Sequence, residues 1–459
     1  MPTLALALLL AAGLSSERGT NETAEREPLA VERRYVVERI RLEGLQQTRP
    51  SEVLRHLTVT EGQLLDDQAV LVSRLRLLQL GWFSRVDTRV EKGSERGLVV
   101  LVFDFTERNT LIISDLVLGS TPPQRIYGGL GLSELNFLGL GLALSGAFVY
   151  GGSPAGRPLD PSRFAAHGNF FAPDIVLDGL PLVFGVSAIA LRGEELTCPD
   201  PRCDAFRNDY GNAPRLRYER FGGDIAVGIR PGPFERLLAG YRMEHLEAST
   251  IGSAVPSGAS GPLPFLRLGR STLAALTGSY DRDTRNDLFF PTGGTRLSLA
   301  IVFASKVLGS DYDYSRYLLQ LESDHRLLFG HALKLLGAAG AVQGEAPFFE
   351  RFYPADFAYF SIGPALGRAL ELNFSTDSRY DSYLGMVGAE YGIPLWSHGQ
   401  FFHRGYLALG VRWLYSTARA GAPRTTASST PFSGDVALRL DTPVGSFNFS
   451  AAYALDNFL

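Results

Sequence analysis

The sequence predicts a mainly β protein, in which one small α+β domain precedes an antiparallel transmembrane barrel of about 16 strands. Segments that alternate between apolar and polar residues, each bounded by turn residues, fill residues 109–459. Apart from the first residues, no uninterrupted apolar run is long enough for a spanning helix. A chain that spans a membrane without such helices must form a closed barrel, because only closure satisfies every backbone group in lipid.

The composition indicates a folded protein and argues against several classes. Hydrophobic residues make up 45% of the 459 residues and charged residues 20%, so the chain can bury a large apolar surface. The net charge of −4 gives no electrostatic basis for nucleic-acid binding. Fifty glycines and 29 phenylalanines are many for a soluble enzyme, whereas membrane barrels use glycine at bends and aromatic residues at the interfaces.

The N-terminus predicts export. Residues 4–14, LALALLLAAGL, have the length of a signal-peptide core, although no Lys or Arg precedes them. We expect a signal peptide at 1–16; a mis-assigned start and a short buried helix are the alternatives. Residues 17–34 are polar and without periodicity, which predicts a flexible segment.

A different pattern covers residues 35–108. An extended segment at 37–44 precedes a short helix at 50–57 and an amphipathic helix at 64–78, which we expect Gly81 to end. Two strands follow at 83–91 and 97–105. The order strand, helix, helix, strand, strand predicts a small α+β domain.

Residues 77–86, LLQLGWFSRV, carry the pattern L-x-x-x-G-x-F-x-x-V. In this motif and in its element order the domain resembles a POTRA (polypeptide-transport-associated) domain; an unrelated α+β domain of the same order is the alternative. A three-stranded sheet has edges that can bind an extended client by β-augmentation, unless they are shielded. The client-binding residues predicted on these strands are Val86, Thr88, Val90, Val99, Leu101 and Phe103.

The rest of the chain predicts barrel strands. Its 351 residues (459 minus 108), at about 22 per strand and connection, allow about 16 strands. Insertions at 196–215 and 254–264 are expected to be extracellular loops, with short turns in the periplasm. A soluble β-sandwich or propeller is the alternative, although no repeat of constant period supports a propeller. The predicted strands are 111–118, 125–137, 141–150, 182–191, 222–229, 237–247, 272–280, 295–303, 314–322, 331–343, 369–373, 383–391, 404–414, 434–440 and 445–454.

Two segments carry a specific resemblance. Residues 280–303 read YDRDTRNDLFFPTGGTRLSLAIVF, a charged cluster and a double-glycine turn followed by strand alternation. This segment resembles the hairpin of the BamA/TamA family of outer-membrane assembly factors, in which D-x-R is followed by F-P-T-x-G, and residues 128–141, GGLGLSELNFLGLG, resemble that family's second strand. The hairpin motif is carried by Asp283, Arg285, Phe290, Pro291 and Gly294.

The resemblance implies a function in the outer membrane, with the POTRA domain in the periplasm. We expect a non-enzymatic protein that assists insertion or translocation of polypeptides. A weak seam between the first and last barrel strands would template client strands. The partners implied are outer-membrane lipids, unfolded outer-membrane or secreted polypeptides, and periplasmic chaperones or assembly partners. The predicted seam residues are Leu111, Ile113, Phe447, Phe449 and Tyr453.

One family feature is missing. The family's long sixth loop carries an Arg-Gly-aromatic tip that pairs with an aspartate on a neighbouring strand. This chain has Gly367-Arg368 in inverted order, and alanine stands at the expected aspartate in residues 406–410. Arg368 is therefore a candidate loop anchor, with an ordinary lumen or surface arginine as the alternative. The alternative function is a divergent channel or secretion pore for solutes or a dedicated partner; an exported β-sandwich without a membrane span is a third.

Other chemistry is weakly indicated. Cys198 and Cys203 are predicted to form a disulfide, because an exported protein meets an oxidising environment. A zinc site would need two further ligands, and no histidine is near. Arginines interleave the carboxylates of 281–287, which favours a charge network over catalysis. We therefore expect no catalytic residue, metal or cofactor.

Overall fold

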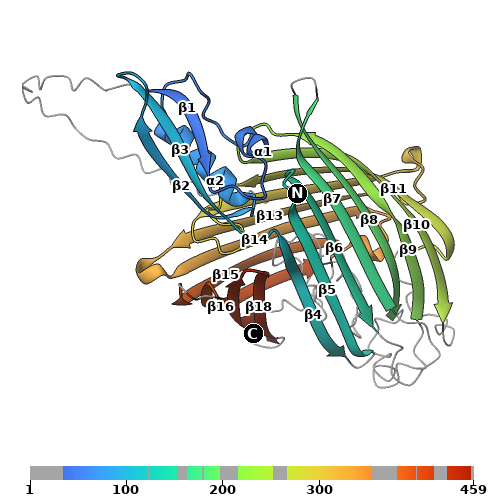
Figure 1. Ribbon diagram of the computed structural model, residues 1–459. Coiled ribbons are helices and arrows are strands. Elements are labelled where there is room, and N and C mark those ends of the chain that lie inside the picture. The colour runs from blue at the N-terminus through green and yellow to red at the C-terminus, as the bar shows by residue number, and fades with distance from the viewer. Residues whose placement is uncertain are drawn as a thin grey trace, which may run out of the picture.

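The computed structural model describes residues 35–121, 124–151, 163–177, 180–196, 215–251, 266–352, 380–397, 399, 401–417 and 432–455. Residues 1–34, including the predicted signal peptide, Arg368, and the Cys198 and Cys203 pair lie outside the described residues. The described chain forms two bodies, an N-terminal domain and a large curved sheet (Figure 1).

The N-terminal domain packs two helices on a three-stranded sheet of order β1-β3-β2. β3 lies in the centre, parallel to β1 and antiparallel to β2. Asp66 caps α2 by accepting a hydrogen bond from the Gln68 amide. The apolar faces of sheet and helices meet in a core that includes Val37, Leu77 and Trp82. The elements are β1 (Val36–Glu43), α1 (Pro50–Arg55), α2 (Asp67–Gln79), β2 (Phe83–Lys92) and β3 (Leu98–Glu107), which confirms the predicted α+β order.

The second body is a 15-stranded sheet in which each strand pairs with the next along the chain, from β4 to β18. All these pairings are antiparallel. The strands are β4 (Leu111–Thr121), β5 (Gln124–Phe137), β6 (Leu142–Gly151), β7 (Arg163–Leu177), β8 (Leu180–Leu196), β9 (Arg215–Ile229), β10 (Glu235–Ile251), β11 (Gly269–Asp283), β12 (Gly294–Ala304), β13 (Tyr314–Arg326), β14 (Ala332–Gly344), β15 (Tyr383–Trp396), β16 (Arg404–Thr417), β17 (Phe432–Thr442) and β18 (Gly445–Leu455).

The mainly β prediction is confirmed, with one difference in detail. The predicted strand at 369–373 lies outside the described residues. β7 was missed by the sequence reading, because its sequence RFAAHGNFFAPDIVL doubles alanine and phenylalanine and carries a proline, which breaks the apparent alternation. The predicted extracellular insertions 196–215 and 254–264 lie almost wholly outside the described part of the chain.

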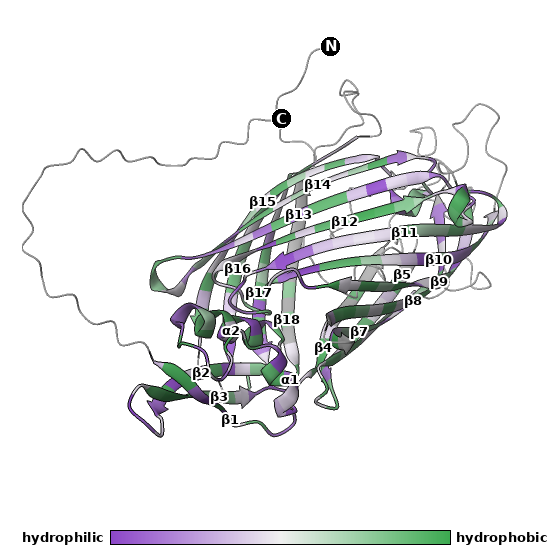
Figure 2. Cartoon of the chain, turned by 90° about the horizontal axis from the view of Figure 1, so that it is seen from above, coloured by the Kyte–Doolittle hydropathy of each residue, from purple (hydrophilic) through white to green (hydrophobic). Residues whose placement is uncertain are grey.

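The sheet is apolar outside and charged inside. On β13, Leu319 and Leu321 are exposed, whereas Glu322 and Asp324 on the opposite face are buried. The alternation is visible along the strands in Figure 2. This arrangement is the reverse of a soluble barrel and is typical of one surrounded by lipid. Within the described residues, no helix is long and apolar enough to cross a membrane.

The N-terminal domain docks on one end of the barrel through backbone-directed hydrogen bonds. Trp82 Nε1 donates to the Leu135 carbonyl at the end of β5 (2.8 Å). Gln79 Nε2, at the C-terminus of α2, donates to the carbonyls of Asp283 (3.0 Å) and Arg285 (2.7 Å). Because these acceptors belong to the backbone, the docking fixes the domain against the ends of β5 and β11.

A buried histidine lies in the same interface. His56, the residue after α1, is 2% exposed and lies 3.4 Å from Asp174 of β7. Arg230 pairs with the same aspartate at 2.9 Å. Burial, followed by the positive charges of Arg230, Arg76 and Arg55, holds the pKa of His56 well below its usual 6.5. Asp174 does not reverse this shift, because Arg230 already engages its carboxylate. The neutral imidazole is therefore the form that fits the docked domain.

Two glycines of the N-terminal domain provide a matched stability test. Gly44 and Gly62 both have φ of +84°. A Cβ added at Gly44 would lie 2.1 Å from the Phe105 carbonyl oxygen, whereas a Cβ added at Gly62 would have no atom within 4 Å. We expect Gly62→Ala to cost about 1–2 kcal/mol of backbone strain and Gly44→Ala to cost clearly more, through the added clash. Urea-dependent proteolysis of the N-terminal domain in the full-length protein measures both; equal losses would contradict the packing at Gly44.

Docking should weaken in acid. Above pH 6.5 His56 is neutral in both the docked and the undocked state. As the pH falls below this value, the undocked state binds a proton that the docked state resists, so docking loses free energy. Spin labels on the N-terminal domain and the barrel should report a wider distance distribution at about pH 5 than at about pH 8. His56→Gln should remove the pH dependence, and an unchanged response in this variant would assign it to another group.

Candidate functional site at the barrel seam

Among the described residues, one backbone hydrogen bond joins the two edges of the large sheet. Since the sheet has 15 strands that are all antiparallel to their neighbours, its edge strands β4 and β18 run in the same direction. They touch where both strands begin, at the end that carries the N-terminal domain: the Ile113 amide donates to the Val444 carbonyl (2.9 Å). Gly445 makes this approach possible, because an added Cβ would lie 2.6 Å from the Ile113 carbonyl oxygen. Along the rest of the described strands, no ladder joins the two edges.

The predicted seam residues lie on these edges. Ile113 is at the contact point, and Leu111 precedes it with 55% exposure. Phe447 and Phe449 stack on one another along β18, with ring centroids 6.4 Å apart. The backbone of Tyr453 pairs with Gly434 on the inner neighbour, β17. The structure thus brings Ile113 to β18 and leaves the other four along two edges that are not paired with each other.

The motif predicted from residues 280–303 forms a rigid turn between β11 and β12. Arg285 binds the Asp283 carboxylate (2.7 Å) and Glu322 of β13 (3.1 Å). Asp287 accepts hydrogen bonds from the amides of Phe289 and Phe290. These contacts fix the turn from inside the barrel.

Gly294 closes the turn with φ of +106°, and an added Cβ would lie 2.4 Å from the Thr284 carbonyl oxygen. A side chain at this position would therefore meet both a strained backbone and a direct clash. Pro291 lies with Phe290 in the wall of a small lumenal cavity of about 40 Å³. The whole motif thus shapes the turn and faces the lumen.

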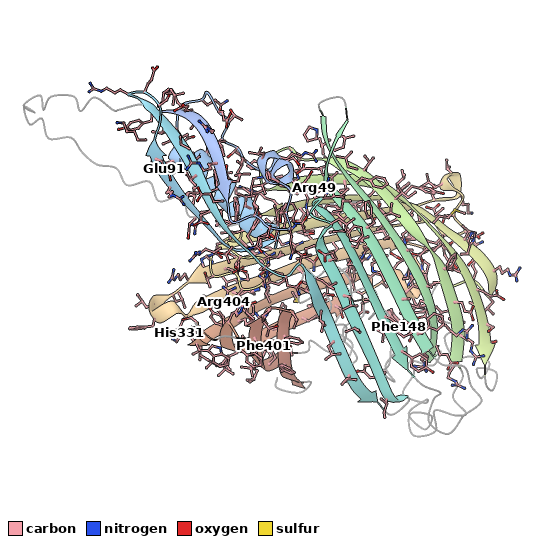
Figure 3. All side chains as sticks on the ribbon, viewed as in Figure 1. Arg49, Glu91, Phe148, His331, Phe401 and Arg404 are labelled. Atoms are coloured by element: carbon pink, nitrogen blue, oxygen red, sulfur yellow. The ribbon has the colours of Figure 1, made fainter. Side chains whose placement is uncertain are left out.

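This turn reaches across the mouth of the barrel. Asp287 pairs at 2.9 Å with Arg404. Arg404, which is labelled in Figure 3, begins β16, four strands beyond β12 in the sheet order. Arg404 also pairs with Asp441 near the end of β17 (2.8 Å), and Asp441 in turn pairs with Arg108 ahead of β4 (3.3 Å). Burial disfavours the Asp287 carboxylate, but Arg404 and the two backbone amides outweigh it and lower its pKa. A chain of charges therefore links the turn to both sides of the seam.

Most of the residues predicted to bind a client are not accessible on a free strand edge. Val86, Val99, Leu101 and Phe103 are buried. β3 is central, so both of its edges are already paired. The outer edge of β1 is covered by the chain around Leu64, which forms a bridge to Val36.

Within the described residues this leaves the outer edge of β2 free, with Thr88 half-buried on it and Val90 52% exposed. Only these two of the six predicted residues are accessible on a free edge. A strong β pattern marks a strand, but it does not distinguish a central strand from an edge strand.

A second charge cluster was missed by sequence reasoning. Inside the barrel, Arg242 of β10 binds Glu350 (2.7 Å) and Glu244 (2.6 Å), and Glu244 also pairs with Arg220 of β9 (3.0 Å). Glu350 belongs to the short helix η4 (Phe348–Glu350), which therefore lies fastened to the barrel wall. The sequence did contain a signal for this cluster, because arginine and glutamate occur at alternate positions that point into the barrel on neighbouring strands. No cluster of metal-ligating side chains occurs in the part of the chain that the structure describes.

Comparisons with protein families match both bodies. Residues 136–457 match the Omp85 superfamily domain. Residues 35–108 match the POTRA family, described as a surface antigen variable number repeat.

Similar proteins include the outer membrane protein assembly factor BamA of Nitratidesulfovibrio vulgaris, 26% identical over 321 residues, 69% of this chain and 36% of the relative. The chain thus spans about a third of that protein's length. The structure of CdiB from Escherichia coli has a TM-score of 0.57 and 12% identity, with 92% of this chain and 73% of that chain covered. The structure of CdiB from Acinetobacter baumannii has a TM-score of 0.50 and 10% identity, with 92% of this chain and 74% of that chain covered.

The family matches cover the strands from β6 to β18 and the docked N-terminal domain. A barrel of this family with a POTRA domain lies in the bacterial outer membrane, with the POTRA domain in the periplasm. The chain therefore belongs to the Omp85 superfamily, as a BamA-like outer-membrane protein.

Proposed function

We propose that this protein assists the insertion or translocation of polypeptides at the outer membrane. The POTRA domain would capture an unfolded client, and the seam between β4 and β18 would template a client strand. The observation that carries the proposal is the seam itself: its two edge strands are parallel, and within the described residues the backbone hydrogen bond between them lies at their periplasmic ends. Relatedness to BamA supports the same class of function.

The direction of the edge strands supports strand templating. Two parallel edges cannot pair antiparallel with each other, but a single strand entering between them in the opposite direction would be antiparallel to both. Such a strand would satisfy the free backbone groups of β4 and β18, which lipid leaves without hydrogen-bond partners. All other neighbouring strands of this sheet are antiparallel, so the entering strand would continue the same pattern.

The free edge of β2 supports client capture by the POTRA domain. An exposed edge strand presents unpaired N–H and C=O groups to which an extended peptide can add. Arg74 Nε donates to the Val86 carbonyl (2.6 Å), so α2 occupies one end of this edge. We therefore place client capture at Thr88 and Val90.

The mouth of the barrel favours this function over a steadily open pore. The 284–293 turn crosses the periplasmic opening to reach β16, and the POTRA domain docks beside it. Single-channel recording separates the two functions, because an occluded mouth passes little steady current. The partners we propose are unfolded outer-membrane or secreted polypeptides, periplasmic chaperones that deliver them, and the lipid around the apolar outer face.

Photocrosslinking tests the capture site. A photoreactive amino acid at Val90, on the free β2 edge, should crosslink to unfolded outer-membrane polypeptides in cells. The same group at Arg39 on β1 should not, because residues 61–65 already hydrogen-bond the outer edge of that strand at Tyr35, Val37 and Ile40. Equal yields at both positions would show that the β2 edge is not the capture site.

A reversible lock tests the seam. In a background with Cys198→Ser and Cys203→Ser, oxidation of the pair Ile113→Cys and Val444→Cys should stop client insertion into liposomes, since it ties together the backbone groups that touch at 2.9 Å. Reduction should restore insertion.

The control pair is Leu407→Cys with Leu438→Cys, which face each other on the already paired strands β16 and β17. This lock should have little effect, because these strands do not need to separate. Full insertion by the oxidised seam variant would rule out strand entry at this site.

A further inference from the structure

We propose that Phe289 and Phe290 are positioning residues that hold the periplasmic end of the seam together. Their rings support the side chains of Arg108 and Arg404, which both pair with Asp441. We call this cluster the seam clasp; its members are Phe289, Phe290, Arg108, Arg404, Asp441 and Asp287. The inference rests on the proposed function of the seam and adds a role for the FFPTGG turn, whose two aromatic side chains have no other assigned purpose.

The clasp crosses the seam between its two sides. Arg108 lies three residues before Leu111, which starts β4, and Asp441 lies four residues before Gly445, which starts β18. Their ion pair spans 3.3 Å, with side chains 12% and 5% exposed. It therefore joins the chain entering one edge strand to the chain entering the other, beside the hydrogen bond from Ile113 to Val444.

Each arginine of the clasp lies on one phenylalanine of the turn. The Arg108 guanidinium is 4.2 Å from the Phe289 ring centroid. The Arg404 guanidinium is 5.1 Å from the Phe290 ring centroid. The aromatic faces favour both cations and restrict their side chains, and this directs both toward Asp441.

The charges of the clasp are balanced. Two arginines face two aspartates, because Arg404 bridges Asp287 of the turn (2.9 Å) and Asp441 of β17 (2.8 Å). Asp441 would otherwise be a buried carboxylate beside the seam, so it depends on both cations. Loss of either arginine or of its aromatic support should loosen the same contact.

The clasp is also connected to the POTRA domain. Gln79 at the end of α2 holds the carbonyls of Asp283 and Arg285, at the base of the same turn. Next to it, an added Cβ at Gly81 would lie 2.9 Å from Leu288, so the helix end and the turn are in close contact. A displacement of α2 on client binding would therefore move the platform on which Arg108 and Arg404 rest.

Seam opening without a client provides the test. Ile113→Cys is introduced with Cys198→Ser and Cys203→Ser, and its labelling by a membrane-impermeant maleimide is measured in liposomes of outer-membrane lipids. We expect Phe289→Leu, which keeps an apolar side chain of similar size but removes the aromatic face, to raise the labelling rate roughly two- to thirty-fold, the range of a cation–π contact. Phe289→Tyr, which keeps the aromatic face, should label at the parental rate.

Two further variants separate the clasp from a general loss of packing. Arg108→Ala should behave as Phe289→Leu does, and Arg108→Lys should restore part of the closure. Phe401→Ala, in a neighbouring turn and 53% exposed, should leave labelling unchanged. Heat-modifiable gel mobility identifies variants with a folded barrel, and rates are compared among those.

Parental labelling rates in both Phe289→Leu and Arg108→Ala would overturn the clasp, as would equal rates in Phe289→Leu and Phe289→Tyr. The measurement contains no client, so it can fail or succeed independently of the insertion assay. Faster labelling together with absent client insertion would retain the clasp and reject the proposed function.

Discussion

Fifteen strands, each hydrogen-bonded to the next, satisfy the backbone groups that lipid would leave without partners, except along the two edges of the sheet. These edges run in the same direction, and in the described part of the chain the hydrogen bond that joins them lies where both strands begin. Most other features of the molecule depend on this constraint. The glycine at Gly445, the position of the POTRA domain and the charges at the periplasmic mouth all lie where the edges come together.

Paired charge organises the inside of the barrel. Arg242 and Glu350 fasten η4 to the wall, and Arg404 with Asp441 joins the 284–293 turn to the last strands. These networks are distributed over several strands. A charge in the lumen is stable only when its partner is present, so each network ties together elements that are distant along the chain.

The POTRA domain is linked to the seam by contacts from one helix end. Gln79 and Trp82 bind backbone carbonyls of two different barrel turns. His56 lies buried in the same interface, where its neutral form is favoured. Docking of the POTRA domain and the contacts at the seam are thus connected through a small set of residues.

The sequence alone determined the alternating strands, the α+β order of the N-terminal domain and the turn at 284–293, because period-two patterns, caps and turn glycines act over a few residues. It missed β7, and it assigned client binding to Leu101 and Phe103, which the fold buries in a central strand. Only the tertiary structure decided which edge of a sheet is free and which charges meet. The pairing of Arg108 with Asp441 and the hydrogen bond from Ile113 to Val444 arise from contacts between residues hundreds of positions apart, which no local pattern encodes.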